Sequence, residues 1–156
     1  MHFYVNKMIN IALYQPDIPQ NTAAIIRLCA CFNTNLDIIR PCGFDLNDKK
    51  IKRIAMDYFK KCKITVHQSY DKFLNNKKNS RVILMTTKAK ENYYSFKFKV
   101  KDTILFGRES LGVPKIVHNK SFKKLKIPLK NNARSLNVSM AAAIVLSEAL
   151  KQNNLL

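Results

Sequence analysis

The sequence predicts an α/β fold with a mostly parallel sheet flanked by helices. Short apolar runs of strand length alternate along the chain with longer helical segments, as in repeated strand–helix units. The 156 residues suit one domain, and no linker or internal repeat divides them. We therefore expect a single domain over residues 1–156, with residues 1–7 as an N-terminal extension.

The first part of the chain is expected to form strand, helix and strand. Residues 8–14 are a short apolar run with β-branched side chains, which predicts a buried strand. A helix is predicted over residues 23–32, with Asn21 or Thr22 as its N-cap. Residues 36–39 predict the second strand.

The middle of the chain is predicted to contain a basic helix over residues 48–59, because its apolar residues recur on one face. Strands are expected at 64–67 and 81–86. A short helix at 70–74 and a polar loop at 75–80 lie between them.

The last third of the chain begins with an irregular, basic and aromatic segment at 88–101. A strand is predicted at 103–106, a helical turn at 114–119 and a final strand at 125–127. Residues 137–152 predict the longest helix of the chain. Strand and helix thus alternate to the end, which favours parallel pairing.

The net charge of +18 favours a polyanionic partner. The excess of lysine over arginine, with abundant Asn and Ile, also fits the drift of an AT-rich genome, which accounts for part of the charge. RNA is favoured over a membrane surface, because no helix combines a basic face with a strong apolar face. No apolar run approaches the roughly 18 residues of a transmembrane helix. Residues 1–7 also lack the features of a signal peptide, so we expect a cytoplasmic protein.

The four cysteines and three histidines do not indicate a metal site. No Cys-x-x-Cys pair occurs, and no histidine stands at zinc spacing. The histidines are scattered, so a His-based catalytic pair is not indicated either. We expect reduced thiols that pack as small apolar residues, and no bound metal.

The most informative stretch is residues 104–114, Ile-Leu-Phe-Gly-Arg-Glu-Ser-Leu-Gly-Val-Pro. It holds Gly107 and Gly112, two of only three glycines in the chain, directly after an apolar run. Glycine is favoured where the backbone needs positive φ or a close approach. The stretch is no phosphate loop, because the Lys-Ser/Thr of a Walker motif is missing.

Two further segments accompany this stretch. Residues 127–139, Ile-Pro-Leu-Lys-Asn-Asn-Ala-Arg-Ser-Leu-Asn-Val-Ser, run from a strand through a polar turn into a helix, and residues 19–27 read Pro-Gln-Asn-Thr-Ala-Ala-Ile-Ile-Arg. In this order and spacing the three segments resemble the motifs of the SPOUT superfamily of RNA methyltransferases, over nearly the whole chain. Residues 9–22 and the Pro-Cys-Gly-Phe turn at 41–44 are similar to the small bacterial tRNA 2′-O-methyltransferases that modify the wobble nucleotide.

The resemblance implies a deep C-terminal trefoil knot, formed by the loops after Met85, Phe106 and Ile127. It also implies S-adenosylmethionine (SAM) as methyl donor, held by the knotted loops. The Gly-rich turn that binds dinucleotides on a Rossmann sheet is absent after the first strand, so SAM needs this other site.

The SAM contacts implied by the resemblance are Met85, Gly107, Ile127 and Ser135. Apolar side chains at Met85 and Ile127 suit the faces of adenine, while backbone groups suit its polar edge. From the residues alone, Met85 and Ile127 also fit buried strand positions, and Gly107 also fits a turn.

The same resemblance implies catalytic roles for Arg27, Asn21, Glu109, Ser135 and Asn137. Arginine stays protonated, so Arg27 is expected to grip a phosphate beside the target ribose or to polarise the 2′-hydroxyl. Asn21 is expected to position the start of its helix, and Glu109 to order the SAM loop and pair with Asn21 or Arg27. Ser135 and Asn137 open the last helix as anion ligands or caps. Each residue also fits a purely structural role, as an exposed arginine, a loop carboxylate or a cap.

The implied partners are the anticodon loop of tRNA and a second copy of the chain. SPOUT proteins complete their active site across a dimer interface, and residues 140–146 suit either that contact or the core. If the charged side chains of the predicted basic helix contact only solvent, the lysines of the irregular segment 88–101 are expected to contact the RNA instead. The residues expected to contact RNA are Arg27, Lys49, Lys50, Lys52 and Arg53.

The chain departs from the wobble methyltransferases at three positions. Met140 stands where they usually carry asparagine, Ser147 where they carry tyrosine, and Phe59 where histidine is common. The motifs implied to hold SAM are intact, so we expect activity. Two alternatives stay open: a non-catalytic RNA-binding protein of the same fold, and a 2′-O-methyltransferase that acts on another RNA, such as ribosomal RNA.

Overall fold

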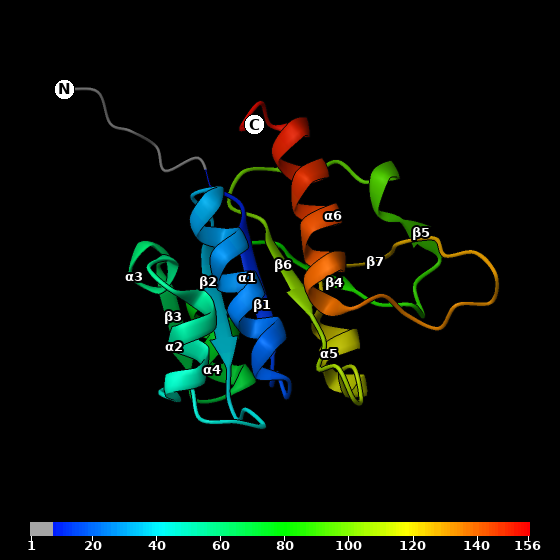
Figure 1. Ribbon diagram of the computed structural model, residues 1–156. Helices are drawn as coiled ribbons and strands as arrows, with labels where there is room; N and C mark the ends of the chain where they lie inside the picture. The colour runs from blue at the N-terminus through cyan, green and yellow to red at the C-terminus, as the bar shows by residue number, and fades with distance from the viewer. Residues whose placement is uncertain (1–7) are drawn as a thin grey trace.

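A seven-stranded sheet with the strand order β3-β2-β1-β6-β4-β7-β5 organises the computed structural model, which describes residues 8–156 (Figure 1). All neighbouring strands run parallel, which confirms the predicted α/β class. The strands are β1 (Asn10–Tyr14), β2 (Asn35–Ile39), β3 (Ile64–His67), β4 (Val82–Met85), β5 (Glu91–Asn92), β6 (Thr103–Phe106) and β7 (Lys123–Lys126). The helices are α1 (Pro19–Cys31), α2 (Lys49–Ala55), α3 (Tyr58–Lys61), α4 (Tyr70–Asn76), the 3-10 helix η1 (Tyr93–Ser95), α5 (Lys115–Lys120) and α6 (Val138–Gln152).

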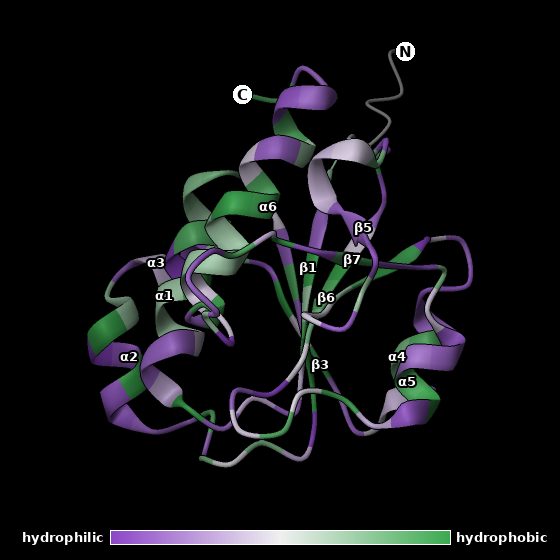
Figure 2. Cartoon of the chain, turned by 90° about the vertical axis from the view of Figure 1, so that its right-hand side faces the viewer, coloured by the Kyte–Doolittle hydropathy of each residue, from purple (hydrophilic) through white to green (hydrophobic). Residues whose placement is uncertain are grey.

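Helices cover both faces of the sheet, as a parallel sheet requires (Figure 2). Alternate side chains of one strand pack on different layers because the side-chain period of a strand is two. On β1, Ile11 and Leu13 join the core beneath α1, α2 and α6, while Ala12 and Tyr14 join the core beneath α4 and α5.

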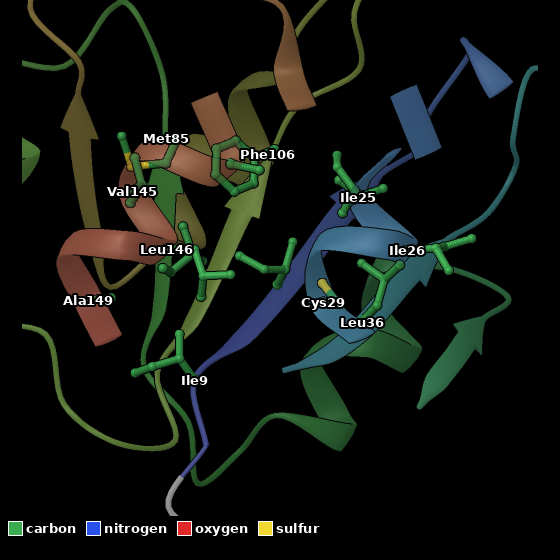
Figure 3. Close-up of a cluster of buried hydrophobic side chains, with 14 of the residues drawn as sticks. Ile9, Ile25, Ile26, Cys29, Leu36, Met85, Phe106, Val145, Leu146 and Ala149 are labelled. Carbon is green, nitrogen blue, oxygen red and sulfur yellow. The ribbon is translucent and has the colours of Figure 1, made fainter. Parts of the chain in front are cut away.

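The larger core lies between the sheet and the pair α1 and α6 (Figure 3). Helix α1 contributes Ile25 and Ile26, and α6 contributes Val145 and Leu146, each no more than 1% exposed. Burial of such a side chain is worth roughly 1.5–3 kcal/mol. This packing holds both helices against one face of the sheet.

Helix α1 begins at Pro19, four residues earlier than predicted, and its N-cap residue is Ile18. The expectation that Asn21 or Thr22 caps the helix is therefore wrong, and both side chains are buried inside its first turn. Proline suits the first helical position, because its missing N–H would have no helical partner there. The earlier start leaves the Asn21 amide free for tertiary contacts.

The basic helix predicted over residues 48–59 is wrong as a single element. Asp48 does cap its start, accepting a hydrogen bond from the Lys50 N–H at 2.8 Å. Helix α2 ends at Ala55 because Met56 has a φ of 51°, which lies outside the right-handed helical region. The short helix α3 then follows as a separate turn.

The C-terminal half follows the prediction with two differences. The strand at 103–106 has the predicted bounds, and the last helix starts at Val138 after the Asn137 cap. The segment 88–101 is not wholly irregular, since it contains β5 and η1. Strand β7 ends at Lys126, so Ile127 is the first residue of the following loop.

Two further expectations concern the ends of the chain and its environment. Residues 1–7, expected to be an N-terminal extension, lie outside the described residues. Within residues 8–156, no helix has both the length and the apolar character needed to cross a bilayer.

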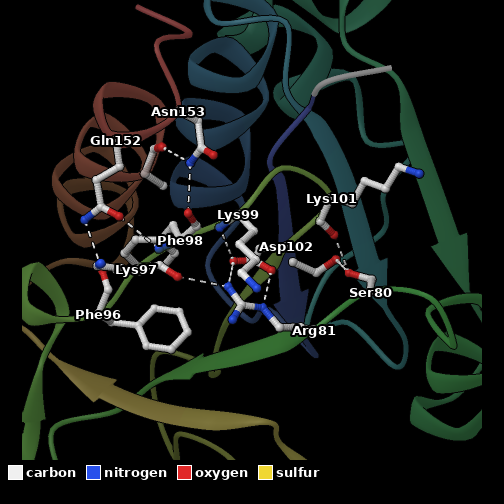
Figure 4. A network of polar contacts seen from close by, with 12 residues as sticks. Ser80, Arg81, Phe96, Lys97, Phe98, Lys99, Lys101, Asp102, Gln152 and Asn153 are labelled. Atoms are coloured by element: carbon white, nitrogen blue, oxygen red, sulfur yellow. Dashed lines mark hydrogen bonds and ion pairs between the residues drawn. The ribbon is translucent and has the colours of Figure 1, made fainter. Parts of the chain in front are cut away.

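A buried ion pair joins the starts of β4 and β6 (Figure 4). The carboxylate of Asp102, 2% exposed, accepts hydrogen bonds from Arg81 Nε at 2.8 Å and Nη2 at 2.6 Å. It also accepts the backbone N–H of Lys99 at 2.7 Å. The arrangement fixes where the two central strands enter the sheet.

Replacing Asp102 by alanine is expected to destabilise the fold by about 2 kcal/mol. Removing one partner of a fully buried pair costs roughly 3–5 kcal/mol, and the partial exposure of Arg81 reduces this cost. Urea unfolding measures the change in the free energy of unfolding. Asp71→Ala is the matched control, since the Asp71 side chain is 80% exposed and should change stability by less than about 0.5 kcal/mol. Equal losses of unfolding free energy in the two variants would contradict a stabilising role for the pair of Asp102 and Arg81.

Candidate functional site

A pocket of about 450 Å³ opens at the carboxyl ends of β4 and β6. Its apolar wall includes Met85 and Phe106, the last residues of these strands, together with Ile127 after β7. Leu136 and Val138 close it from the start of α6. Parallel sheets place ligand sites at this edge, because the loops after the strands converge there.

The loop after β6 folds back on itself through its two glycines. Arg108 and Gly112 exchange two backbone hydrogen bonds of 3.1 and 2.9 Å. Gly112 has a φ of 65°, a conformation that side chains rarely adopt. A Cβ on Gly107 would lie 2.9 Å from the backbone of Gly112, so only glycine allows this close return. The two glycines therefore determine the conformation of the loop that borders the pocket.

Glu109 at the tip of this loop connects it to α1. One carboxyl oxygen accepts the backbone N–H of Asp17 at 2.9 Å, and the other accepts the side-chain amide of Asn21 at 3.3 Å. The expected pairing of Glu109 with Asn21 is thus present. Asp17 also accepts a hydrogen bond from the Ser110 hydroxyl, so four polar groups tie the loop to the start of α1.

Asn137 extends the network to α6. Its Nδ2 donates to Asn21 Oδ1 at 2.9 Å, while its Oδ1 accepts the backbone N–H of Ser139 at 2.9 Å as the N-cap of the helix. One side chain therefore starts the helix and fixes it to α1. Asn21, Glu109 and Asn137 all line the pocket, together with Ser135.

The pKa values of the Asp17 and Glu109 carboxyl groups shift in opposite directions. Burial, and then the hydrogen bond with Asp17, raise the pKa of Glu109 above its ordinary value of 4.5. The same hydrogen bond is the main reason why the pKa of Asp17 is lowered. Asp17 Oδ1 is buried and has no donor among the described residues, so the environment favours the neutral acid of Glu109 over a second negative charge.

Arg108 is the pocket residue that the sequence analysis missed. Its Nε is buried, lacks a hydrogen-bond acceptor within residues 8–156 and lies 3.9 Å from Asp17 Oδ2. The guanidinium borders the pocket and can receive an anionic group. Its position next to Gly107 was the only available signal, and adjacency to Glu109 suggested an internal pair instead.

The predicted residues divide into two groups in space. The implied SAM contacts Met85, Gly107, Ile127 and Ser135 gather in the pocket with Asn21, Glu109 and Asn137. Arg27 does not line it: its guanidinium is exposed and lies 4.8 Å from the centre of the Tyr58 ring on α3. The expected RNA contacts Lys49, Lys50, Lys52 and Arg53 are exposed on α2 and also lie outside the pocket.

Cysteines and histidines form no metal cluster in the part of the chain that the structure describes. All four cysteines are free thiols, with Cys29 and Cys62 buried. His67, at the end of the edge strand β3, is buried against Asp37, 2.7 Å from its Oδ1. The polar side chains that line the pocket carry amide, carboxyl, guanidinium and hydroxyl groups.

Comparisons with known proteins agree on one family. The model of the SpoU rRNA Methylase family matches residues 8–147. A tRNA (cytidine(34)-2'-O)-methyltransferase of Beijerinckia indica subsp. indica is 44% identical over 144 residues, which cover 91% of this chain and 90% of that protein. A solved structure described as giving insights into the 2-OH methylation of C/U34 on tRNA has a TM-score of 0.91 and 35% identity, and covers 95% of this chain and 97% of its own.

The fold extends to a more distant relative. The SpoU methyltransferase AviRb of Streptomyces viridochromogenes, solved in complex with its cofactor AdoMet, has a TM-score of 0.88 at 19% identity. The alignment covers 95% of this chain and 61% of AviRb. At this identity the likeness shows the fold alone.

The raised pKa of Glu109 predicts that stability depends on pH. A raised pKa contributes stability that is present below the ordinary value of 4.5 and is lost as pH rises through the folded-state value. The lowered pKa of Asp17 contributes in the opposite sense, with stability lost only as pH falls through its own folded-state value. Glu109→Gln removes the titration of Glu109, because the amide is neutral at every pH.

We therefore expect the wild type to lose stability relative to Glu109→Gln as pH rises from about 4.5 towards neutrality. Urea unfolding at several pH values measures the difference. Glu148→Gln on α6 is a control outside the network, and its difference from the wild type should not change in the same direction. Parallel pH profiles of the wild type and Glu109→Gln would refute a raised pKa of Glu109 in the folded state.

Proposed function

Since the chain belongs to the SpoU rRNA Methylase family, we propose that it transfers a methyl group from SAM to the 2′-hydroxyl of the wobble ribose in tRNA. The family match confirms the resemblance found in the sequence. The observation that carries the proposal is the similarity along nearly the whole chain to proteins described by methylation of nucleotide 34. A single-stranded target, such as the anticodon loop, presents unstacked bases that a protein surface can contact.

The pocket has the properties that SAM binding requires. Its volume of about 450 Å³ lies within the usual range for cofactor sites. Met85 and Ile127 offer apolar contact to a flat ring, and the loop from Gly107 to Gly112 offers backbone polar groups. Arg108 Nε, buried without a hydrogen bond, suits a carboxylate. SAM, when bound, supplies an electrophilic methyl group on a sulfonium.

The protein's own contribution is positioning. Asn21, Glu109 and Asn137 hold α1, α6 and the glycine loop in one arrangement, so that a bound cofactor and the ribose meet in a fixed geometry. Ser135 lies in the pocket with a hydroxyl available to either ligand. We assign no general base, because Glu109, the carboxyl group that lines the pocket, already accepts two hydrogen bonds.

We further propose a homodimer in which Arg27 acts at the partner's pocket. Arg27 lies outside the pocket of its own chain and is exposed on α1. Helix α6, which packs beside α1, exposes Met140 at 62% and Ile144 at 39%. A two-fold contact through this face would cover those apolar side chains and bring Arg27 to the second pocket. There its planar guanidinium suits a phosphate beside the target ribose.

Two finer features complete the proposal. The exposed α2 residues Lys49, Lys50, Lys52 and Arg53 are proposed to contact RNA phosphates. A C-terminal trefoil knot is proposed because β6 inserts between β1 and β4, and because the segments after Met85, Phe106 and Lys126 meet in one pocket. In such a knot the cofactor loops would be held by the topology of the chain itself.

An isolated anticodon stem-loop should be methylated at the wobble ribose by the pure protein with SAM. Mass spectrometry of the nucleosides detects the product. The same stem-loop with a 2′-deoxy wobble nucleotide is the matched control and should stay unmodified. Methylation of ribosomal RNA but not of the stem-loop would identify ribosomal RNA as the substrate. RNA binding without methyl transfer would favour the non-catalytic alternative.

Arg27→Ala should lower the methylation rate roughly 100-fold or more, as expected when a group that stabilises developing charge is lost. SAM affinity, measured by calorimetry, should stay close to wild type. Arg27→Lys should also fail, since a point charge does not replace the planar fork.

Mixed dimers test whether Arg27 acts across the interface. Chains that carry Arg27→Ala are mixed with chains that carry Gly107→Val, a substitution that prevents the pocket loop from closing. Random exchange should restore about a quarter of the wild-type sites, because one site in each mixed dimer receives an intact pocket and an intact Arg27. No recovery in dimers shown to have exchanged would place Arg27 at the pocket of its own chain.

A further inference from the structure

A second cavity, of about 490 Å³, lies at the opposite end of the strands from the cofactor pocket. It is bordered by Leu74 on α4, Lys120 at the end of α5, and Val82 and Phe122 at the starts of β4 and β7. The turn 77–80 after α4 forms its rim. No motif of the sequence analysis falls here, and none of its residues lines the first pocket.

The lining of this cavity is basic and includes no acidic residue. Two of its cations are already paired: Lys77 Nζ lies 2.7 Å from Asp37 Oδ2, and Arg81 binds Asp102. Lys78 is exposed on the rim. Lys120 lies 3.6 Å from Asp71, whose side chain is 80% exposed, and such a surface pair is weak. The ammonium groups of Lys78 and Lys120 therefore stay available to an anion.

Beside these lysines stands an exposed aromatic ring. Phe122 is 60% exposed although its backbone is fixed by a hydrogen bond from its N–H to Val82 O at 2.9 Å. The guanidinium of Arg81 lies 5.1 Å from the Phe122 ring centre and 5.0 Å from that of Phe96. Because Asp102 holds this guanidinium in place (Figure 4), Phe122 is supported on its inner side and open on its outer side.

An open aromatic ring next to free ammonium groups suits one ligand class, a nucleotide. Bases stack on aromatic side chains whatever their sequence, and lysines neutralise the phosphate. We propose that this basic cavity holds one nucleotide of the bound tRNA outside the methylated loop, with its base on Phe122 and its phosphate between Lys78 and Lys120.

The spacing of the two sites agrees with one continuous RNA strand. Strands β4 and β7 lead from the basic cavity to the cofactor pocket, over roughly 10–17 Å at about 3.3 Å per residue. At about 3.4 Å per stacked nucleotide, this corresponds to roughly three to five steps along a strand. The basic cavity is therefore expected to contact the stem or the stem edge of the anticodon arm. This inference rests on the proposed function for the identity of the RNA.

Binding of full-length tRNA, measured without SAM by fluorescence anisotropy at several salt concentrations, tests the site. Lys78→Gln combined with Lys120→Gln should weaken binding and flatten the dependence of log K on log salt by roughly one to two units. Lys63→Gln combined with Lys151→Gln is the charge-matched control on exposed lysines elsewhere, and should flatten the slope less. Equal slopes in the two double variants would overturn the phosphate contact.

Phe122 gives an independent readout. Phe122→Leu should weaken tRNA binding by roughly five-fold or more, while Phe122→Tyr, which keeps the ring, should bind as the wild type does. Thermal unfolding identifies any loss that comes from the fold. In the wild type, tRNA carrying 4-thiouridine should photocrosslink to the peptide that contains Phe122. No crosslink, or equal binding by the leucine and tyrosine variants, would overturn the stacking contact.

A competition measurement distinguishes a site for polymeric RNA from a site for free nucleotides. Uridine 5′-monophosphate at millimolar concentration should not displace tRNA, because a single nucleotide lacks the contacts of the rest of the strand; complete displacement would assign the cavity to free nucleotides. Since tRNA binding is measured without methyl transfer, the binding result can be interpreted even if the protein does not catalyse the proposed reaction. Conversely, unchanged tRNA binding in all variants would reject the cavity as an RNA site, even if the protein methylates the wobble ribose.

Discussion

The side-chain amide of Asn21 holds together the three segments on which the site depends. Its Nδ2 donates to Glu109 and its Oδ1 accepts from Asn137, residues that lie 88 and 116 positions further along the chain. Only an amide can donate on one side and accept on the other in a fixed orientation, so a carboxylate or an alkyl group would break one contact. Asn21 is 8% exposed, and each partner left unsatisfied there would cost roughly 1–3 kcal/mol. The network thus belongs to the architecture of the pocket as much as to its chemistry.

Much of this arrangement could be predicted from the sequence because it follows local patterns. Apolar runs such as residues 103–106 specify buried strands, and the Asn137 cap specifies the start of the last helix. The start of α1 was predicted too late, since Asn21 looks like a cap when Pro19 is not taken as the first helical residue. The end of α2 at Met56 is a backbone effect without a local signal, because methionine is an ordinary helix residue.

The site was harder to predict where it depends on distances across the fold. The pairing of Glu109 with Asn21 could be anticipated only through a resemblance, since periodicity contains no information about contacts 88 residues apart. Arg108 was missed because an arginine beside a glutamate usually indicates a local pair, whereas here the two side chains contact different groups of Asp17, its N–H and its carboxylate. The basic cavity was invisible for the same reason: Lys78, in the turn after α4, is far in the sequence from Lys120 at the end of α5 and Phe122 just before β7.

The distribution of charge shows how a protein with a net charge of +18 keeps specific sites. Several of its ten acidic residues are engaged inside the fold: Asp37 and Asp102 in buried pairs, and Asp17 and Glu109 in the pocket network. Surface lysines are therefore left largely without counter-charges and give a general attraction for polyanions, which alone selects no position. Arginine is scarce by comparison, and Arg27, Arg81 and Arg108 each stand where a planar fork matters: over Tyr58, between two phenylalanines, and at the pocket. In the proposed function, the lysines attract RNA in general, whereas the few arginines and the amide network position its backbone and ribose.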